Sequence, residues 1–289
     1  MTRGNLSLSR YTGFNGQNVA ISSSKPSTRF TTDTSMNRYL LDAIYHDEFE
    51  LVYQPQVEIY GHQVVGVEAL LRWKSAKLGY VPPGDFIPLA EKSGLILEIG
   101  KLVIEKACMQ AAIWKKQYSS SVRIAVNVSY MQVHDDAIVK HIESCLKKYN
   151  LDVSTLEIEL TESSLVKDTS KVISVLNDLK DMGIRTAIDD FGTGYSSLSH
   201  LASMPFNLIK IDRSFISLLG VNAANTAVTE SIIELSKKLK MEVLAEGVET
   251  EMQKNILLGG ECDFIQGNLF CCPVSADRVP EIVGMKNTD

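Results

Sequence analysis

Short apolar runs rich in β-branched residues alternate with longer amphipathic stretches along most of the chain. The runs with the composition of strands are Phe49–Ile59, Val64–Leu71, Val122–Val128, Leu156–Leu160, Arg185–Ile188, Leu208–Ile211, Glu242–Ala245 and Phe264–Gln266. Stretches with helical periodicity lie between most of them, including Leu95–Gln117, Ser170–Met182 and Ala223–Lys240. This repeated alternation predicts a mainly parallel sheet joined by crossover helices.

The first two strand-like runs are the exception to this alternation. Only the turn Tyr60-Gly61-His62 separates them, which is too short for a helical crossover, so the two strands should pair antiparallel. We therefore predict an α/β fold of the modified TIM type, a (β/α)8 barrel with an antiparallel opening strand. An open, doubly wound sheet is the alternative.

The N-terminal residues, 1–35, differ from the rest of the chain. They are rich in Ser, Thr, Asn and Gly and lack both hydrophobic periodicity and the apolar core of a secretory signal. We interpret them as a flexible leader. Residues 36–289 then form one barrel domain, close to the ~250 residues typical of such barrels.

Composition and charge narrow the class of protein. The chain has 289 residues, 45% of them hydrophobic, which fits a globular protein, and no apolar run is long enough to span a bilayer. The net charge of −6 disfavours a protein that binds nucleic-acid polymers, although divalent cations could still bring a phosphate ligand to acidic residues. Five cysteines without CxxC spacing disfavour disulfides and zinc sites, and so indicate the cytoplasm.

Polar residues stand near the carboxyl end of nearly every strand-like run. They are Glu68, Asn127, Glu159, the pair Asp189-Asp190, Lys210, Glu246 and Gln266. In a parallel barrel these positions converge on one rim, where barrel active sites are built. Burying several carboxylates together is unfavourable unless cations neutralise them.

The residue types at this rim point to metal chemistry. Carboxylates and an amide oxygen suit hard cations such as Mg²⁺ or Mn²⁺, and Asp189-Asp190 can supply ligands to two neighbouring ions. Two such ions commonly serve phosphodiester hydrolysis. No histidine stands at a strand end, which disfavours a zinc hydrolase. Lys210 could instead form a Schiff base in an aldolase, but the surrounding acids would keep this lysine protonated.

The same residues belong to ordered motifs that resemble the EAL domain, the cyclic di-GMP phosphodiesterase module of bacteria. Glu68-Ala69-Leu70 stands within VEALLRW and follows Tyr53-Gln54-Pro55. The later motifs, in the family's order, are FIPLAE (86–91), NVS (127–129), ELTE (159–162), DDFGTGYSSL (189–198), KID (210–212), EGVE (246–249) and QG (266–267). The resemblance covers residues 37 to 284.

The resemblance implies a metal-dependent enzyme that hydrolyses cyclic di-GMP to linear pGpG by in-line attack of hydroxide on phosphorus. It implies Mg²⁺ or Mn²⁺ in a two-metal site with the ligands Glu68, Asn127, Glu159, Asp189 and Asp190. Lys210 would orient or help activate the attacking water, and Glu246 would contribute to the metal–water network. The positions that match substrate contacts are Gln54, Leu71, Arg72, Glu249 and Gln266.

Three further expectations come from this resemblance. Glu162 matches an acid that steadies the DDFGTG loop, a region associated with homodimer formation. Asn268 stands where relatives usually have Tyr, which affects substrate contacts more than catalysis. The alternative function is a catalytically inactive cyclic di-GMP receptor or protein-interaction module.

Overall fold

A closed ring of eight strands forms the centre of the protein. The computed structural model describes residues 33–118, 122–165, 168–194 and 198–285. Around the ring the order is β1-β9-β8-β7-β6-β5-β4-β2, and β1 closes it by pairing with β2. The strands are β1 (Phe49–Glu58), β2 (Val64–Ser75), β4 (Arg123–Val128), β5 (Leu156–Thr161), β6 (Arg185–Phe191), β7 (Leu208–Ile211), β8 (Glu242–Glu246) and β9 (Phe264–Gln266).

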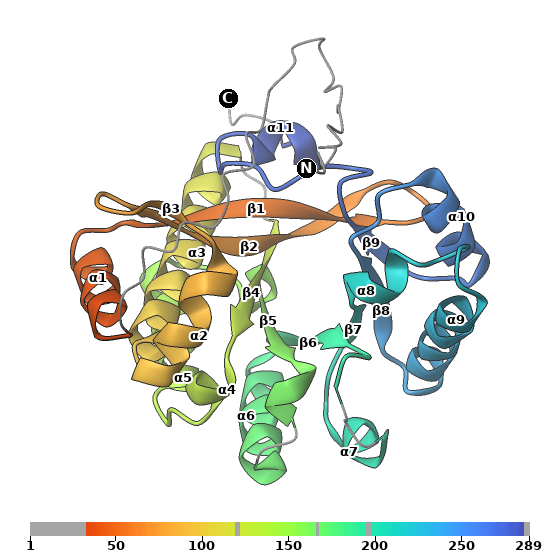
Figure 1. The fold of residues 1–289 in the computed structure, drawn as a ribbon, viewed down its shortest axis with the longest axis horizontal. Coiled ribbons are helices and arrows are strands. Elements are labelled where there is room, and N and C mark those ends of the chain that lie inside the picture. The colour runs from red at the N-terminus through yellow and green to blue at the C-terminus, as the bar shows by residue number, and fades with distance from the viewer. Residues whose placement is uncertain (1–32, 119–121, 166–167, 195–197, 286–289) are drawn as a thin grey trace, which may run out of the picture.

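Strand β1 is antiparallel to both of its neighbours, β2 and β9, whereas the other barrel strands pair in parallel. The short β1–β2 connection leaves no room for a helix, which is why this pair is a hairpin. The predicted barrel with an antiparallel opening strand is confirmed, and the open-sheet alternative is wrong. Figure 1 shows β1 and β2 lying across one end of the molecule, above the parallel strands.

Strand β2 extends beyond its predicted end at Leu71. It pairs with β4 only as far as Ala69, and its continuation to Ser75 forms a hairpin with a short strand that the sequence pattern did not predict, β3 (Gly79–Val81). The pairing of Phe49 with Trp73 holds this extension against β1. Glu68 therefore lies inside a long strand, at the point where β2 leaves the barrel wall.

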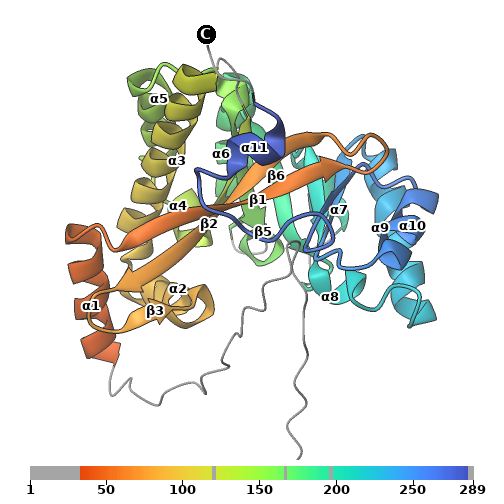
Figure 2. The same ribbon diagram turned by 90° about the horizontal axis from the view of Figure 1, so that it is seen from above.

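Helices surround the barrel, as Figures 1 and 2 show. The helices of at least nine residues are α1 (Asp33–Tyr45), α2 (Pro83–Ser93), α3 (Ile96–Tyr118), α5 (Ile138–Lys148), α6 (Thr169–Met182), α9 (Ala223–Lys238) and α10 (Glu251–Gly259). Shorter helices are α4 (Tyr130–Val133), α7 (Leu198–Ser203), α8 (Arg213–Ile216) and α11 (Val279–Val283), with 3-10 turns η1 (Val153–Thr155) and η2 (Glu162–Leu165). Within the described ranges, every helix is too short or too polar to cross a membrane.

The interior of the barrel changes character from one end to the other. Side chains two residues apart on a strand point to the same face, so Leu208 lies below Lys210 and Leu244 below Glu246. Ala187, Leu208 and Leu244 form a small apolar cluster of their own. At the amino end of the strands, buried Glu157 pairs with Arg123 and Arg185. Side chains therefore fill the interior of the barrel beneath the polar residues at the carboxyl ends of the strands, which we call the acidic rim: Glu68, Asn127, Glu159, Asp189, Asp190, Lys210, Glu246 and Gln266.

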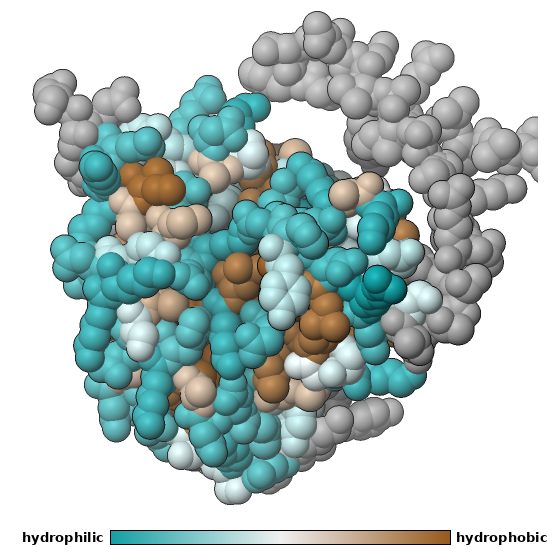
Figure 3. Space-filling model, turned by 90° about the vertical axis from the view of Figure 1, so that its left-hand side faces the viewer, coloured by the Kyte–Doolittle hydropathy of each residue, from teal (hydrophilic) through white to brown (hydrophobic). Residues whose placement is uncertain are grey.

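The outer surface is mixed in polarity. Figure 3 shows hydrophilic side chains covering most of the face that carries α1 and α2, with apolar side chains gathered in patches between them. Leu41 and Tyr45 are exposed apolar residues of α1. Of the predicted leader, residues 1–32 lie outside the described residues, and α1 begins at Asp33.

Candidate functional site

Lys210 lies at the centre of the polar rim, surrounded by carboxylates from four other strands. Its Nζ is 2.8 Å from Glu159, 2.8 Å from Glu246, 3.0 Å from Asp189 and 3.6 Å from Glu68. The lysine side chain is fully buried. Burial alone lowers the pKa of Lys210, but the nearby carboxylates outweigh burial and raise it well above its usual value. These carboxylates therefore favour the protonated form of the lysine.

The carboxylates around Lys210 have too little positive charge near them. Burial raises the pKa of Glu159 and of Glu246 well above the usual value, and Lys210 only partly offsets this rise. A single ammonium cannot neutralise all the carboxylates that face it. Additional positive charge in this place would stabilise their ionised forms.

Glu68 is held in place by two side-chain amides. Asn127 Nδ2 donates to Glu68 Oε1 at 2.7 Å, and Gln266 Nε2 donates to Glu68 Oε2 at 2.6 Å. Gln266 Nε2 also donates to Gln54 Oε1 at 3.1 Å, and Gln54 Nε2 donates to the carbonyl of Cys271 at 3.1 Å. The orientation of Asn127 leaves its Oδ1 as the atom that could coordinate a cation.

The Asp189-Asp190 pair depends on an irregular backbone. Adjacent strand residues normally point to opposite faces, but the register of β6 shifts between Ile188 and Phe191 and Asp190 has φ 54°. Both carboxylates consequently line the same cavity. The pKa of Asp190 is raised to about 6, mainly because the carboxyl group is buried and secondly because Asp189 repels its charge.

Glu162 supports the loop after Asp190 from behind. Its Oε2 accepts hydrogen bonds from the backbone N–H groups of Gly192, at 2.9 Å, and Gly194, at 3.0 Å. A Cβ at Gly194 would lie only 2.9 Å from the Glu162 carboxyl carbon, and Gly192 has φ 101°. Glycine is required here by close approach and by backbone conformation. Residues 195–197 of the DDFGTGYSSL motif lie outside the described residues.

Two groups of side chains in the rim could hold a metal ion. Oxygen atoms of Glu68, Glu159 and Asp189 lie within 4.8 Å of one another, as do those of Asp189, Asp190 and Glu246. The groups share Asp189 and contain only carboxylates. An all-oxygen donor set with excess negative charge fits a hard divalent cation.

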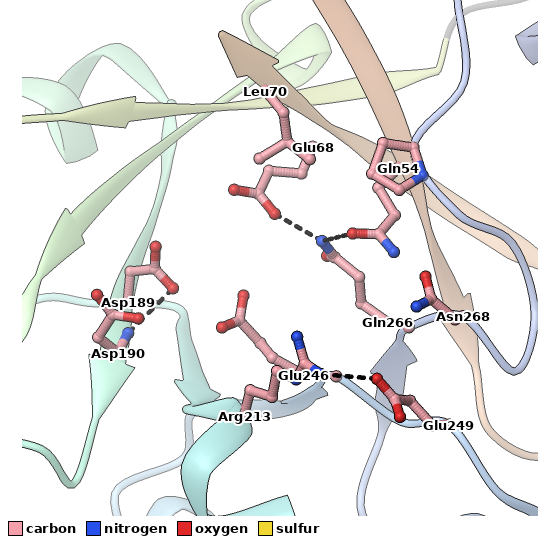
Figure 4. Close-up of a pocket in the computed structure, with 13 residues that line it drawn as sticks. Gln54, Glu68, Leu70, Asp189, Asp190, Arg213, Glu246, Glu249, Gln266 and Asn268 are labelled. Atoms are coloured by element: carbon pink, nitrogen blue, oxygen red, sulfur yellow. Dashed lines mark hydrogen bonds and ion pairs between the residues drawn. The ribbon is translucent and has the colours of Figure 1, made fainter. Parts of the chain in front are cut away.

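A cavity of about 390 Å³ opens above these carboxylates. Figure 4 shows Glu68, Asp189 and Glu246 pointing toward a common space from different sides. The cavity is lined by Gln54, Glu68, Leu70, Asp189, Asp190, Arg213, Glu246, Gly247, Glu249, Gln266, Gly267, Asn268 and Pro273.

A second cavity, of about 260 Å³, adjoins the first and shares Leu70, Asp189 and Asp190 with it. Leu71, Arg72 and Asn127 line this second cavity, together with apolar residues of α2 and α3. The lining also includes Gln132, which is almost fully buried and whose Nε2 has no hydrogen-bond partner.

The structure brings most of the predicted site residues into one place. Leu71, Arg72 and Asn127 line the second cavity but not the first, and Glu162 lies behind the loop. Leu70 lines both cavities and was missed, although strand alternation places it on the same face as Glu68. Arg213 was also missed, and no pattern in the sequence distinguishes it.

Comparison with known proteins identifies similar chains. The family model described as "EAL domain" matches residues 37–273. The bifunctional diguanylate cyclase/cyclic di-GMP phosphodiesterase MucR of Pseudomonas aeruginosa is 39% identical over 83% of this chain and 35% of its own length. The cyclic di-GMP phosphodiesterase PA2567 of the same species is 38% identical over 87% of this chain and 42% of its own length.

Solved structures show the same similarity. A PaMucR phosphodiesterase in complex with c-di-GMP superposes with a TM-score of 0.81 at 38% identity, covering 85% of this chain and 99% of the other. The chain spans only about a third of the length of the first curated relatives it matches.

Proposed function

Because this chain belongs to the EAL domain family, we propose that it is a metal-dependent phosphodiesterase that hydrolyses cyclic di-GMP to linear pGpG. The observation that carries the proposal is the set of carboxylates around Lys210, which opens onto a cavity large enough for part of a dinucleotide. Relatives named as cyclic di-GMP phosphodiesterases support the choice of substrate.

The residues proposed to hold Mg²⁺ or Mn²⁺ are Glu68, Asn127, Glu159, Asp189 and Asp190. Their donor atoms are all oxygens, and the two carboxylate groups that share Asp189 suit two neighbouring ions. When bound, such ions lower the pKa of water and offset negative charge on the reacting phosphate. The amides of Asn127 and Gln266 fix the orientation of Glu68 in advance of binding.

Lys210 and Glu246 are proposed to position the attacking water. Lys210 Nζ lies among the carboxylates proposed to hold the metals, where its ammonium donates hydrogen bonds and would orient or help activate the water. Glu246 lies 2.8 Å from this ammonium on the floor of the cavity, where its carboxylate can accept a hydrogen bond from the water. Together they hold the water in one orientation, which favours in-line attack.

The substrate is proposed to extend across both cavities. Gln54, Gln266 and Glu249 line the first and present groups that can hydrogen-bond to a base or a ribose. Arg72 in the second cavity suits a phosphate oxygen, and Leu71 supplies apolar contact beside it.

We also propose that the protein is cytoplasmic, in line with its free cysteines. We further propose that it forms a homodimer, which size-exclusion chromatography with light scattering tests.

Product analysis tests the proposed function. Purified protein is incubated with cyclic di-GMP and Mg²⁺, with and without EDTA, and the nucleotides are separated by chromatography. We expect pGpG only in the sample without EDTA. Binding of cyclic di-GMP with no pGpG would instead support the alternative, an inactive receptor.

A further inference from the structure

Arg213 brings a positive charge to a cavity lined mainly by acids and amides. Among the described residues that line the 390 Å³ cavity, it alone is cationic, because Lys210 lies beneath the lining. Arg213 begins helix α8, three residues after Lys210. Its Nη2 donates to Glu249 Oε1 at 2.8 Å, and Figure 4 shows this contact at the edge of the cavity.

The ion pair between Arg213 and Glu249 contributes little to the stability of the fold. The Arg213 side chain is 66% exposed and that of Glu249 is 40% exposed. Exposed ion pairs contribute little to folding, because water and salt screen them and two long side chains lose freedom. The place of the pair at the edge of the cavity therefore points to a role other than stability.

The neighbouring backbone is shaped around Arg213. Gly247 has φ 68°, and a Cβ at this position would lie 2.3 Å from Arg213 Cγ. The arginine stem therefore lies against bare backbone in the turn that follows β8. The same turn carries Glu249, whose N–H donates to Gln253 Oε1 at 2.7 Å. The backbone of Glu249 is thus fixed by Gln253 and its carboxylate by Arg213.

The charge of Glu249 would oppose a substrate that carries phosphates unless it is compensated. Arg213 supplies that compensation and also fixes the direction of the carboxylate. A carboxylate held in this way can accept hydrogen bonds from the edge of guanine, which presents adjacent N–H donors. Adenine lacks the ring N–H at the corresponding position.

We propose that Arg213 is a positioning residue for cyclic di-GMP: it holds Glu249 so that the carboxylate accepts hydrogen bonds from a guanine edge. This assignment rests on the proposed function. It concerns binding of the substrate rather than the reacting phosphate, because Arg213 acts through Glu249. The effect of losing it should therefore appear in KM and leave kcat nearly unchanged.

The test is a set of steady-state measurements of pGpG formation at saturating Mg²⁺ with wild type, Arg213→Ala, Arg213→Lys, Glu249→Ala and the double variant. We expect Arg213→Ala to raise KM about tenfold with kcat within about threefold of wild type. Arg213→Lys should recover part of the loss, since it keeps the charge. The double variant should be no worse than Glu249→Ala, because Arg213 has no separate role.

Arg278→Ala is the matched control. It removes an arginine of similar exposure that pairs with Glu281 and lines neither cavity, so its KM should equal that of wild type. An unchanged KM in Arg213→Ala, or effects that multiply in the double variant, would overturn the assignment while leaving the proposed function intact. A wild-type protein that forms no pGpG would overturn both.

Discussion

The ammonium of Lys210 lies 2.8 Å from the carboxylate of Glu159, and neither side chain is exposed to solvent. Lys210 comes from β7 and Glu159 from β5, so the contact reaches across β6 inside the barrel. This lysine is the internal counter-charge of the acidic rim. The protein can therefore fold with the carboxylates close together and still leave them short of positive charge.

Lys210→Met should lower both stability and activity. Removing one partner of a buried ion cluster leaves uncompensated charge, so we expect the free energy of unfolding at pH 7 to fall by about 3 kcal/mol. Urea unfolding in EDTA measures this change, and pGpG formation should also be lost. Lys237→Ala, which removes an exposed ion pair with Glu261, is the control and should change stability by less than about 1 kcal/mol. Equal stabilities of the two variants would argue against the role of Lys210 as internal counter-charge.

Divalent cations should stabilise the folded protein through the acidic rim. Binding to the folded state at a hundredfold excess over Kd contributes about 2.7 kcal/mol. For a domain of this size we expect Mg²⁺ to raise Tm by roughly 5–10 °C. Asp189→Asn changes the residue shared by both metal-holding groups, so it should lose most of that shift. Differential scanning calorimetry measures it, and an identical shift in wild type and Asp189→Asn would place the cation elsewhere.

Glu162→Ala should reduce turnover without abolishing folding. The substitution removes the acceptor for the N–H groups of Gly192 and Gly194, so the loop no longer holds Asp190 in its left-handed conformation. We expect kcat to fall about tenfold, equivalent to about 1.4 kcal/mol. A higher Mg²⁺ concentration should be needed for half-maximal rate, and Mg²⁺ titration of pGpG formation checks this. Unaltered Mg²⁺ dependence would mean that the loop does not position the metal ligands.

Asn268→Tyr should tighten substrate binding. Asn268 lines the larger cavity, and an aromatic ring there offers a surface on which a base can stack. Stacking of this kind is worth about 1–3 kcal/mol per base. We expect KM for cyclic di-GMP to fall at least fivefold with little change in kcat. Asn268→Leu is the control for added bulk, and an equal fall in KM with this variant would show that aromatic stacking is not the cause.

Much of the fold could be predicted from the local pattern of apolar and polar residues in the sequence. β-branched runs and helical periodicity predicted every strand of the barrel, since each pattern reflects which face of an element is buried. The extension of β2 and its pairing with β3 were missed, because Lys74 and Ser75 interrupt the apolar pattern and are held in the strand by pairing with distant backbone, β3 on one side and Glu48 on the other.

The candidate site was predictable where side chains follow the strand period. Glu159, Lys210 and Glu246 stand at strand ends, and parallel strands bring such ends together. The pairing of Arg213 with Glu249 was not predictable, because it joins the start of helix α8 to the turn after β8, which is distant in sequence. The left-handed backbone at Asp190 likewise depends on a register shift that no local pattern encodes.

The central claim, that this acidic rim directs water onto the phosphorus of cyclic di-GMP, is tested most directly by hydrolysis in ¹⁸O-labelled water. The reaction is run with defined Mg²⁺, with Glu68→Ala in parallel, and pGpG is analysed by mass spectrometry. We predict one ¹⁸O atom in the 5′-phosphate of pGpG from wild type, and no product from Glu68→Ala, which we expect to fold. Absence of labelled pGpG from wild type, or equal amounts from Glu68→Ala, would contradict the claim.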